Sequence, residues 1–191
     1  MQVSAFARDD GLWDLDAQIT DTKTHDIVLG AAVRPAGTAI HDLKLRLTID
    51  LSLTIIAVEA VSDAVPYPSY CDQSNALYQP LVGLCLKRDF RQQLKVRLAG
   101  TAGCTHLTEL AQILPTAAIQ AMAGKGEQSY QSDGAKDDVK PFQIDRCHAL
   151  RSDGEVVAKF YARWATGPQP AQAHFSDPNV VSDKQAGMSS I

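Results

Sequence analysis

Alternating apolar and polar residues predict a β-strand over residues 13–20. Trp, Leu, Ala and Ile occupy every second position there, and Asp, Gln and Thr occupy the positions between them. This period of two is typical of a strand with one face in the core and the other in solvent. Asp10-Gly11 is a turn signal just before this segment, so we expect a hairpin with residues 3–8.

The same alternation predicts two further hairpins. Leucine and isoleucine alternate with polar residues over 43–49, and an Asp-Leu-Ser turn then leads into the β-branched run 53–61. Near the other end of the chain, residues 143–151 and 155–164 flank a Ser-Asp-Gly turn, which predicts a third hairpin. The residues predicted to line the buried face of its second strand are Val156, Ala158, Phe160, Ala162 and Trp164.

Between the second and third hairpins the apolar spacing becomes helical. Apolar residues recur every fourth position over 90–98, and a longer stripe runs over 104–118. Pro115 lies inside that stripe, so we expect it to kink the helix or to split it in two. With a helical segment around 73–122, the pattern predicts an α+β fold, in which an antiparallel sheet of three hairpins carries helices on one face.

Composition and charge favour a soluble globular protein. Of 191 residues, 45% are hydrophobic and 21% are charged, and 18 basic residues face 22 acidic ones. The net charge of −4 argues against a nucleic-acid surface, and no apolar run is long enough to span a membrane. The first residues show no signal-peptide pattern, and four scattered cysteines are too few for a disulfide framework, so we expect a reduced, cytoplasmic protein.

We predict a single α+β domain over residues 1–166. Within it, the stretch at about 124–140 has Val139 as its one branched aliphatic side chain and is rich in Gly, Ser, Asp and Lys, which predicts a mobile loop. Residues 167–191 contain three of the nine prolines and show no apolar period. We expect a flexible tail there, or a segment that drapes over a partner subunit of a homodimer.

The motifs of nucleotide-binding enzymes, serine hydrolases and zinc proteases are missing from the sequence. Titratable side chains outside such motifs are therefore the candidates for chemistry. Cys104 and His106 lie in the predicted first turn of the long helix, where unpaired N–H groups favour a thiolate, although Cys104 also fits a core stripe. Cys71 follows a loop with two prolines, where a site and a packing role are both open. Asp14 and Asp16 form either a paired-carboxylate site or a solvated strand face.

Five short motifs stand out along the chain. They are Arg8–Asp14 (RDDGLWD), Thr20–Lys23 (TDTK), His41–Asp50 (HDLKLRLTID), Gly103–Leu110 (GCTHLTEL) and Asp145–Leu150 (DRCHAL). Together they resemble a bacterial family of unknown function, and the resemblance runs from about residue 3 to residue 164. It implies no particular chemistry.

The order of elements is also similar to the iron–sulfur scaffold fold of the IscU and NifU type, part of the NifU/SufE-like fold. In this resemblance Asp42 takes the place of the aspartate in the scaffold's Cys-Gly-Asp motif, and Cys71 follows the strand as a scaffold cysteine does. The segment Cys104–His106 stands where a His-Cys pair begins the late helix. Ile40 replaces the first scaffold cysteine, which departs from the family's pattern.

We predict a small-molecule enzyme that uses side-chain acid/base chemistry without an organic cofactor. His41 and His106 are the predicted acid and base, Asp42 orients them, and Cys71 lines the pocket or acts as a nucleophile. The residues predicted to bind substrate are Trp13, Tyr67, Tyr70 and Cys104. A retro-aldol lyase acting on an aromatic catabolic intermediate fits this set, because such a reaction needs an acid/base pair and no cofactor.

Two alternatives stay open. One is a metal or iron–sulfur carrier with zinc or a cluster held by Asp42, Cys71, Cys104 and His106. The other is a non-catalytic partner-binding module. No ligand pair has a chelating spacing such as Cys-x-x-Cys, so we expect no tightly held structural zinc. If a shared acid/base site exists, His41 and His106 must lie well within about 15 Å of each other, because proton transfer needs contact or one bridging water.

Overall fold

The computed structural model describes residues 1–30, 32–122, 140–141 and 143–167. The chain divides into two compact units, residues 1–133 and 134–191. Most of the predicted loop at 124–140 and of the predicted tail at 167–191 lies outside the described residues. The single domain over residues 1–166 stays a prediction.

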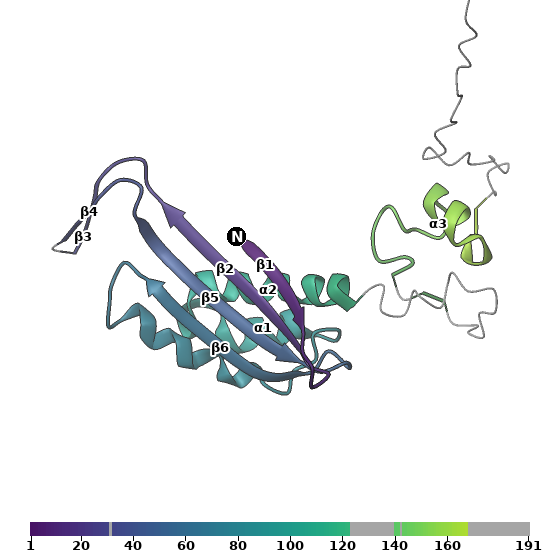
Figure 1. Cartoon of the computed structure of the whole chain (residues 1–191), viewed down its shortest axis with the longest axis horizontal. Coiled ribbons are helices and arrows are strands. Elements are labelled where there is room, and N and C mark those ends of the chain that lie inside the picture. Colours follow the sequence, from purple (N-terminus) through teal and green to yellow (C-terminus); the bar gives the residue numbers. More distant parts are fainter. Residues whose placement is uncertain (31, 123–139, 142, 168–191) are drawn as a thin grey trace, which may run out of the picture. The chain divides into compact units, whose positions relative to one another are not determined.

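A four-stranded antiparallel sheet with the order β1-β2-β5-β6 forms the centre of the first unit (Figure 1). The first two predicted hairpins are confirmed, because β1 pairs with β2 and β5 pairs with β6. The strands are β1 (Gln2–Ala7), β2 (Trp13–Thr22), β5 (Ala39–Ile49) and β6 (Ile55–Ala64).

A short additional hairpin lies between β2 and β5 in the sequence and extends beyond their ends in Figure 1. It consists of β3 (Ile27–Leu29) and β4 (Ala32–Arg34). Strands of three residues are too short to show a periodic pattern, so the sequence did not predict them. Arg34 ties this hairpin to the main sheet, because its guanidinium donates to the carbonyls of Ala39 (2.6 Å) and Val65 (3.1 Å).

Helices cover one face of the sheet, as predicted (Figure 1). The core between them contains one set of side chains from the sheet, such as Leu15, Leu45 and Leu47, and the apolar stripe of α2. Burial of these side chains supplies the main stabilising free energy of the unit. The helical elements are η1 (Cys71–Leu81), α1 (Phe90–Leu98), η2 (Gly100–Ala102) and α2 (Thr105–Met122).

Helix α2 runs through Pro115 as one element, so of the two expected outcomes, a kink or a split, the split does not occur. Proline removes one hydrogen bond of the helix interior, which weakens the helix locally. Pro115 is itself buried, and so are Leu114 and Ala118 on either side of it. Burial of these three side chains favours the continuous helix despite the lost bond. A kink at this position stays a prediction.

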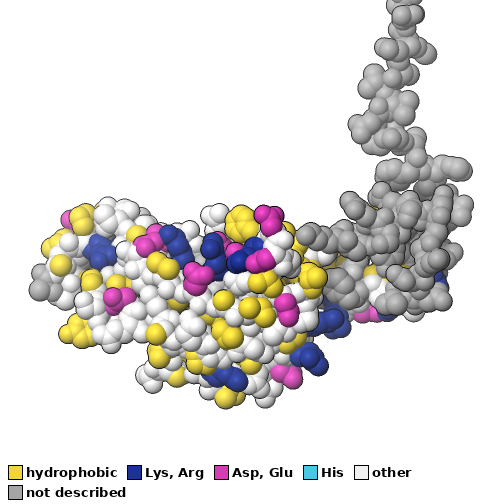
Figure 2. All heavy atoms as spheres, turned by 60° about the horizontal axis from the view of Figure 1, so that its bottom comes forward, with side chains coloured by type: hydrophobic (Ala, Val, Ile, Leu, Met, Phe, Trp, Pro, Cys, Tyr) yellow, Lys and Arg dark blue, Asp and Glu magenta, His cyan; other side chains and the backbone are white. Residues whose placement is uncertain are grey.

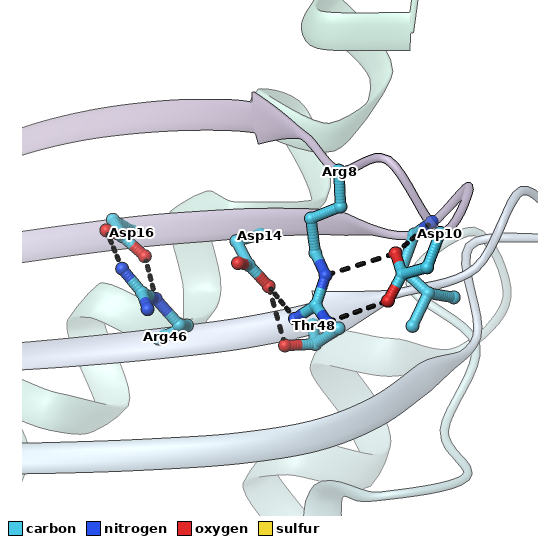
Figure 3. Close-up of polar contacts among 7 residues, drawn as sticks. Arg8, Asp10, Asp14, Asp16, Arg46 and Thr48 are labelled. Atoms are coloured by element: carbon cyan, nitrogen blue, oxygen red, sulfur yellow. Dashed lines mark hydrogen bonds and ion pairs between the residues drawn. The ribbon is translucent and has the colours of Figure 1, made fainter.

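The opposite face of the sheet is polar and carries paired charges (Figure 3). Asp16 accepts two hydrogen bonds from the guanidinium of Arg46 (2.6 and 2.7 Å), and these bonds raise the pKa of Arg46. Asp14 accepts one from the hydroxyl of Thr48 (2.7 Å) and forms an ion pair with Arg8. The two carboxylates therefore join neighbouring strands, which fits a solvated face and not a paired-carboxylate site. Basic and acidic side chains are interspersed on the face of the first unit seen in Figure 2.

The third predicted hairpin is wrong. Residues 155–160 form the helix α3 (Glu155–Phe160), Ala162–Trp164 form the 3₁₀ turn η4, and the described residues from 143 to 150 contain turns and no strand. The alternation was misleading, because the adjacent residues Val157 and Ala158 are both buried, whereas Phe160 is 68% exposed. Glu155 in the first turn favours a helix start through the helix dipole. Cys147, expected in a strand, lies exposed in a turn.

The sheet–helix core makes one prediction about stability. Leu114 is fully buried on α2, so Leu114→Ala should lower the free energy of unfolding by about 2–5 kcal/mol. Val96→Ala on α1 is the matched control, because Val96 is exposed and surface changes usually stay within about 0.5 kcal/mol. Urea denaturation followed by circular dichroism measures both. Equal effects of the two substitutions would contradict this packing.

Candidate functional site

Three segments distant in sequence meet at one end of the sheet, on the face that the helices cover. They are the end of β2 with Asp21, the start of β5 with His41, and the first turn of α2 with His106. Asp21 and His41 lie directly opposite each other in the β2–β5 pairing. The register shifts just beyond this pair, between Asp21 and Thr22. Such bulges often re-aim side chains beside functional sites.

The carboxylate of Asp21 holds His41 through two hydrogen bonds. Its Oδ1 accepts from the backbone N–H of His41 at 2.7 Å and lies 3.0 Å from Nδ1 of the ring. Burial acts to raise the pKa of Asp21, but the bonds from His41 outweigh it, so this pKa is lowered and the carboxylate is ionised near neutral pH. An ionised carboxylate only accepts hydrogen bonds, so Nδ1 of His41 carries a proton and the lone pair of a neutral ring is on Nε2.

His106 lies against the ring of His41. The ring centroids are 3.9 Å apart and the planes are tilted by 33°. Burial of His106 lowers its pKa, the proximity of His41 lowers it further, and Asp21 acts in the opposite direction. His106 is therefore neutral near pH 7. Burial is thus the main cause of the lowered pKa of His106.

A cavity of about 250 Å³ opens beside the two histidines. Its walls combine imidazole, thiol and hydroxyl groups with an apolar part formed by Leu43, Val65 and Pro66. The polar and aromatic lining residues are His41, Tyr67, Cys71, Ser74, Cys104, Thr105 and His106. No Lys, Arg, Asp or Glu is among these described lining residues, so a bound molecule would meet no fixed charge on the wall.

Tyr78 fixes where α2 begins, and so where His106 stands. Its fully buried hydroxyl donates to the carbonyl of Cys104 at 2.7 Å, and the hydroxyl of Thr108 donates to it at 2.8 Å. Gly103 is required just before this turn, because a Cβ atom there would lie 2.8 Å from the carbonyl oxygen of Leu98 and 3.2 Å from the Tyr78 hydroxyl. Tyr78 is thus part of the support of the site and does not line the cavity.

Five of the residues predicted for the site come together at this cavity, and three do not. His41, Tyr67, Cys71, Cys104 and His106 all line it. The remaining three are Asp42, Trp13 and Tyr70.

Asp42 lies on the opposite face of the sheet, where it accepts a hydrogen bond from the side-chain amide of Gln18 at 2.6 Å. The reason is the alternation of the strand, which directs adjacent side chains to opposite faces. Asp42 therefore does not orient the histidines, and it cannot complete a metal site with Cys71, Cys104 and His106.

The two aromatic residues that do not line the cavity have other environments. Trp13 is buried at the far end of β2, about 26 Å from Asp21 at roughly 3.3 Å per residue. Tyr70 is 77% exposed and is not among the lining residues.

Sequence reasoning missed Asp21, although a signal for it was present. Asp21 continues the series Trp13, Leu15, Ala17 and Ile19, so it occupies a position of the predicted buried face. A carboxylate at the end of an apolar face needs a partner, because burial of an unpaired charge is costly. Its partner His41 could not be identified without the register between β2 and β5.

The support of the site by Tyr78 generates a second prediction. Tyr78→Phe removes one hydroxyl and leaves the carbonyl of Cys104 without this donor, so the free energy of unfolding should fall by about 1–3 kcal/mol. Tyr70→Phe is the control, because the Tyr70 side chain is exposed and should change stability little. Thermal or urea unfolding of the two variants provides the comparison. If Tyr78→Phe lowers the free energy of unfolding as little as Tyr70→Phe does, the buried hydroxyl does not hold this turn.

Comparisons with known proteins identify a family but no activity. No curated protein and no solved structure matches the chain, so the similarity to the iron–sulfur scaffold fold stays a prediction. None of the helices in the described part of the chain is long and apolar enough to cross a bilayer. A family model described as "Protein of unknown function (DUF2889)" matches residues 1–120, a range that includes Asp21, His41, Cys71 and His106. The chain belongs to the DUF2889 family.

Proposed function

We propose that this protein is a small-molecule enzyme of the lyase type, which cleaves a C–C bond by a retro-aldol reaction in the cavity beside His41 and His106. The observation that carries the proposal is the Asp21–His41 pair next to a second imidazole on the wall of a cavity. A carboxylate that holds Nδ1–H of a histidine is the usual arrangement for a histidine that acts as a general base through Nε2.

The proposed reaction needs one base and one hydrogen-bond donor. Nε2 of His41 removes the proton of the substrate's β-hydroxyl group, the bond between the α and β carbons breaks, and an aldehyde leaves. The electron pair moves into the carbonyl of the other fragment, where the N–H of neutral His106 stabilises the enolate oxygen. The imidazolium of His41 then returns its proton to the α carbon. No electrons are gained or lost overall, so this step uses no oxidant or reductant.

The lining of the cavity supports an uncharged aromatic substrate. Val65, Pro66 and Tyr67 offer apolar and aromatic surface, and the volume of about 250 Å³ suits a molecule with a single ring. Thr105 and Ser74 add hydroxyl groups that can orient a polar substituent. Cys71 serves as a lining or nucleophilic thiol in this proposal.

The cellular setting is also part of the proposal. All four cysteines are free, which a reducing compartment such as the cytoplasm favours. The homodimer inferred from the composition of the tail stays a prediction.

The enzymatic proposal predicts which substitutions stop turnover. A panel of aromatic β-hydroxy carbonyl compounds is first screened for binding by thermal shift and for aldehyde release with a carbonyl-reactive dye. With a turned-over compound, His41→Gln and Asp21→Asn should each lower kcat by about 10²–10⁴-fold, because they remove the base or its orientation.

Asp42→Asn is the matched control, because it changes a carboxylate next to His41 in sequence but on the other face of the sheet. Its kcat should stay close to that of the unsubstituted chain. Turnover that survives both His41→Gln and His106→Gln, in variants with unchanged unfolding curves, would remove these side chains from the chemistry. Ligand binding without aldehyde release from any compound would favour a non-catalytic binding module.

A further inference from the structure

We propose that Asp21, His41 and His106 form an exchangeable site for one divalent transition-metal ion, open toward the cavity, and that an ion bound there switches the acid/base site off. Neither the family description nor the motifs in the sequence assign a metal to these residues. Metal binding follows from the arrangement of atoms alone, whereas the effect on turnover rests on the proposed function.

The donor atoms suit such an ion in type and in spacing. Each of the three residues offers one ligand atom, and these atoms all lie within 4.8 Å of one another. Two ligands of a tetrahedral ion with bonds of about 2.0 Å are roughly 3.3 Å apart, so modest side-chain rotations bring the set to bonding distance. Two imidazoles and one carboxylate are a common ligand set for Zn²⁺, Fe²⁺ and Co²⁺.

The structure leaves ligand atoms of this set available. Both hydrogen bonds from His41 reach Oδ1 of Asp21, and no described residue donates to the second oxygen, Oδ2. The ring nitrogens of His106 make no hydrogen bond within the described residues, although this side chain is half-buried. Among the described residues no side-chain nitrogen or oxygen is buried without a partner, so solvent, and with it an ion, can reach the nitrogens of the His106 ring. A shared ion would satisfy both rings.

Exposure and ligand number make this an exchangeable site rather than a structural one. The side chain of Asp21 is 43% exposed and that of His41 is 17% exposed, so an ion can reach both from solvent. Structural zinc sites are closed by four protein ligands, whereas three protein ligands leave a position for water or a bound molecule. His41 and His106 also line the cavity, so that position would face it.

The cysteines of the cavity wall are not part of the proposed site. Cys71 and Cys104 line the same cavity, but the described groups with ligand spacing include neither of them. A nitrogen and oxygen ligand set favours Zn²⁺, Fe²⁺ or Co²⁺ over Cu(I) and over iron–sulfur clusters, which prefer thiolates. This assignment therefore differs from the set of Asp42, Cys71, Cys104 and His106 considered for the sequence alone.

An ion at this site would compete with the proposed proton transfer for the same atoms. Metal ligation occupies an imidazole lone pair, and a ligated nitrogen can neither remove a proton nor carry one. Bound metal should thus suppress turnover while it stabilises the fold, because it binds the native arrangement of three distant segments.

The experiment uses the full chain after dialysis against a chelator. Zn²⁺ is titrated by calorimetry and Co²⁺ by visible absorption, with an expected stoichiometry of one ion per chain. His41→Gln and His106→Gln should each weaken binding at least tenfold or abolish it, and Asp21→Asn should weaken it about 10–100-fold. Glutamine keeps most of the side-chain volume, and thermal unfolding of each metal-free variant verifies that it folds.

Two control variants make the result specific. Asp42→Asn and Cys71→Ser should bind both ions as the unsubstituted chain does. Absence of binding at millimolar metal, or binding that both histidine substitutions leave unchanged, would overturn the proposal. Loss of binding in Cys71→Ser, together with thiolate-to-cobalt absorption in the unsubstituted chain, would also overturn it and indicate a sulfur site.

The effect on turnover separates the two proposals. If Zn²⁺ binds through the histidines and turnover persists at saturation, the metal site stands and acid/base catalysis by these residues fails. If no metal binds but His41→Gln stops turnover, acid/base catalysis by these residues stands and the metal site fails. Both proposals are supported if Zn²⁺ inhibits turnover, a chelator reverses the inhibition, and the apparent affinity of inhibition equals the affinity measured by calorimetry.

Discussion

The antiparallel register between β2 and β5 is the constraint on which the rest of the first unit depends. It places Leu15 opposite Leu47 on the face under the helices and Asp16 opposite Arg46 on the open face. A slip of one residue would exchange the two faces and bring charges into the core. The same register puts Asp21 opposite His41, so the site and the core are fixed by one pairing.

The helix layer completes the site through a second contact, at the start of α2. The apolar stripe of α2 sets the face that packs on the sheet, but the position of its first turn depends on the buried hydroxyl of Tyr78 and on Gly103. Tyr78 belongs to η1 and Gly103 to the connection before α2, and neither residue lines the cavity. His106 thus owes its place beside His41 to residues that take no direct part in the site.

The two proposals use the same three side chains for different purposes. A histidine held by a carboxylate can serve as a base or as a metal ligand, because both roles need an unprotonated ring nitrogen. The closely stacked imidazoles and the adjoining cavity are compatible with either role, and proton and metal exclude each other at one nitrogen. The chemistry of the site would then depend on the metal available to it.

The sequence by itself determined the α+β class, the first two hairpins and the helices α1 and α2, because these follow from local periodicity and turn residues. It also singled out His41, Cys71, Cys104 and His106, which all line the cavity, because their residue types are reactive wherever they lie. It failed over 155–164, where a short apolar pattern was compatible with strand and helix alike. Only the tertiary structure decided that Asp21, and not Asp42, faces the histidines, because strand register and the packing of α2 are set by contacts between segments distant in sequence.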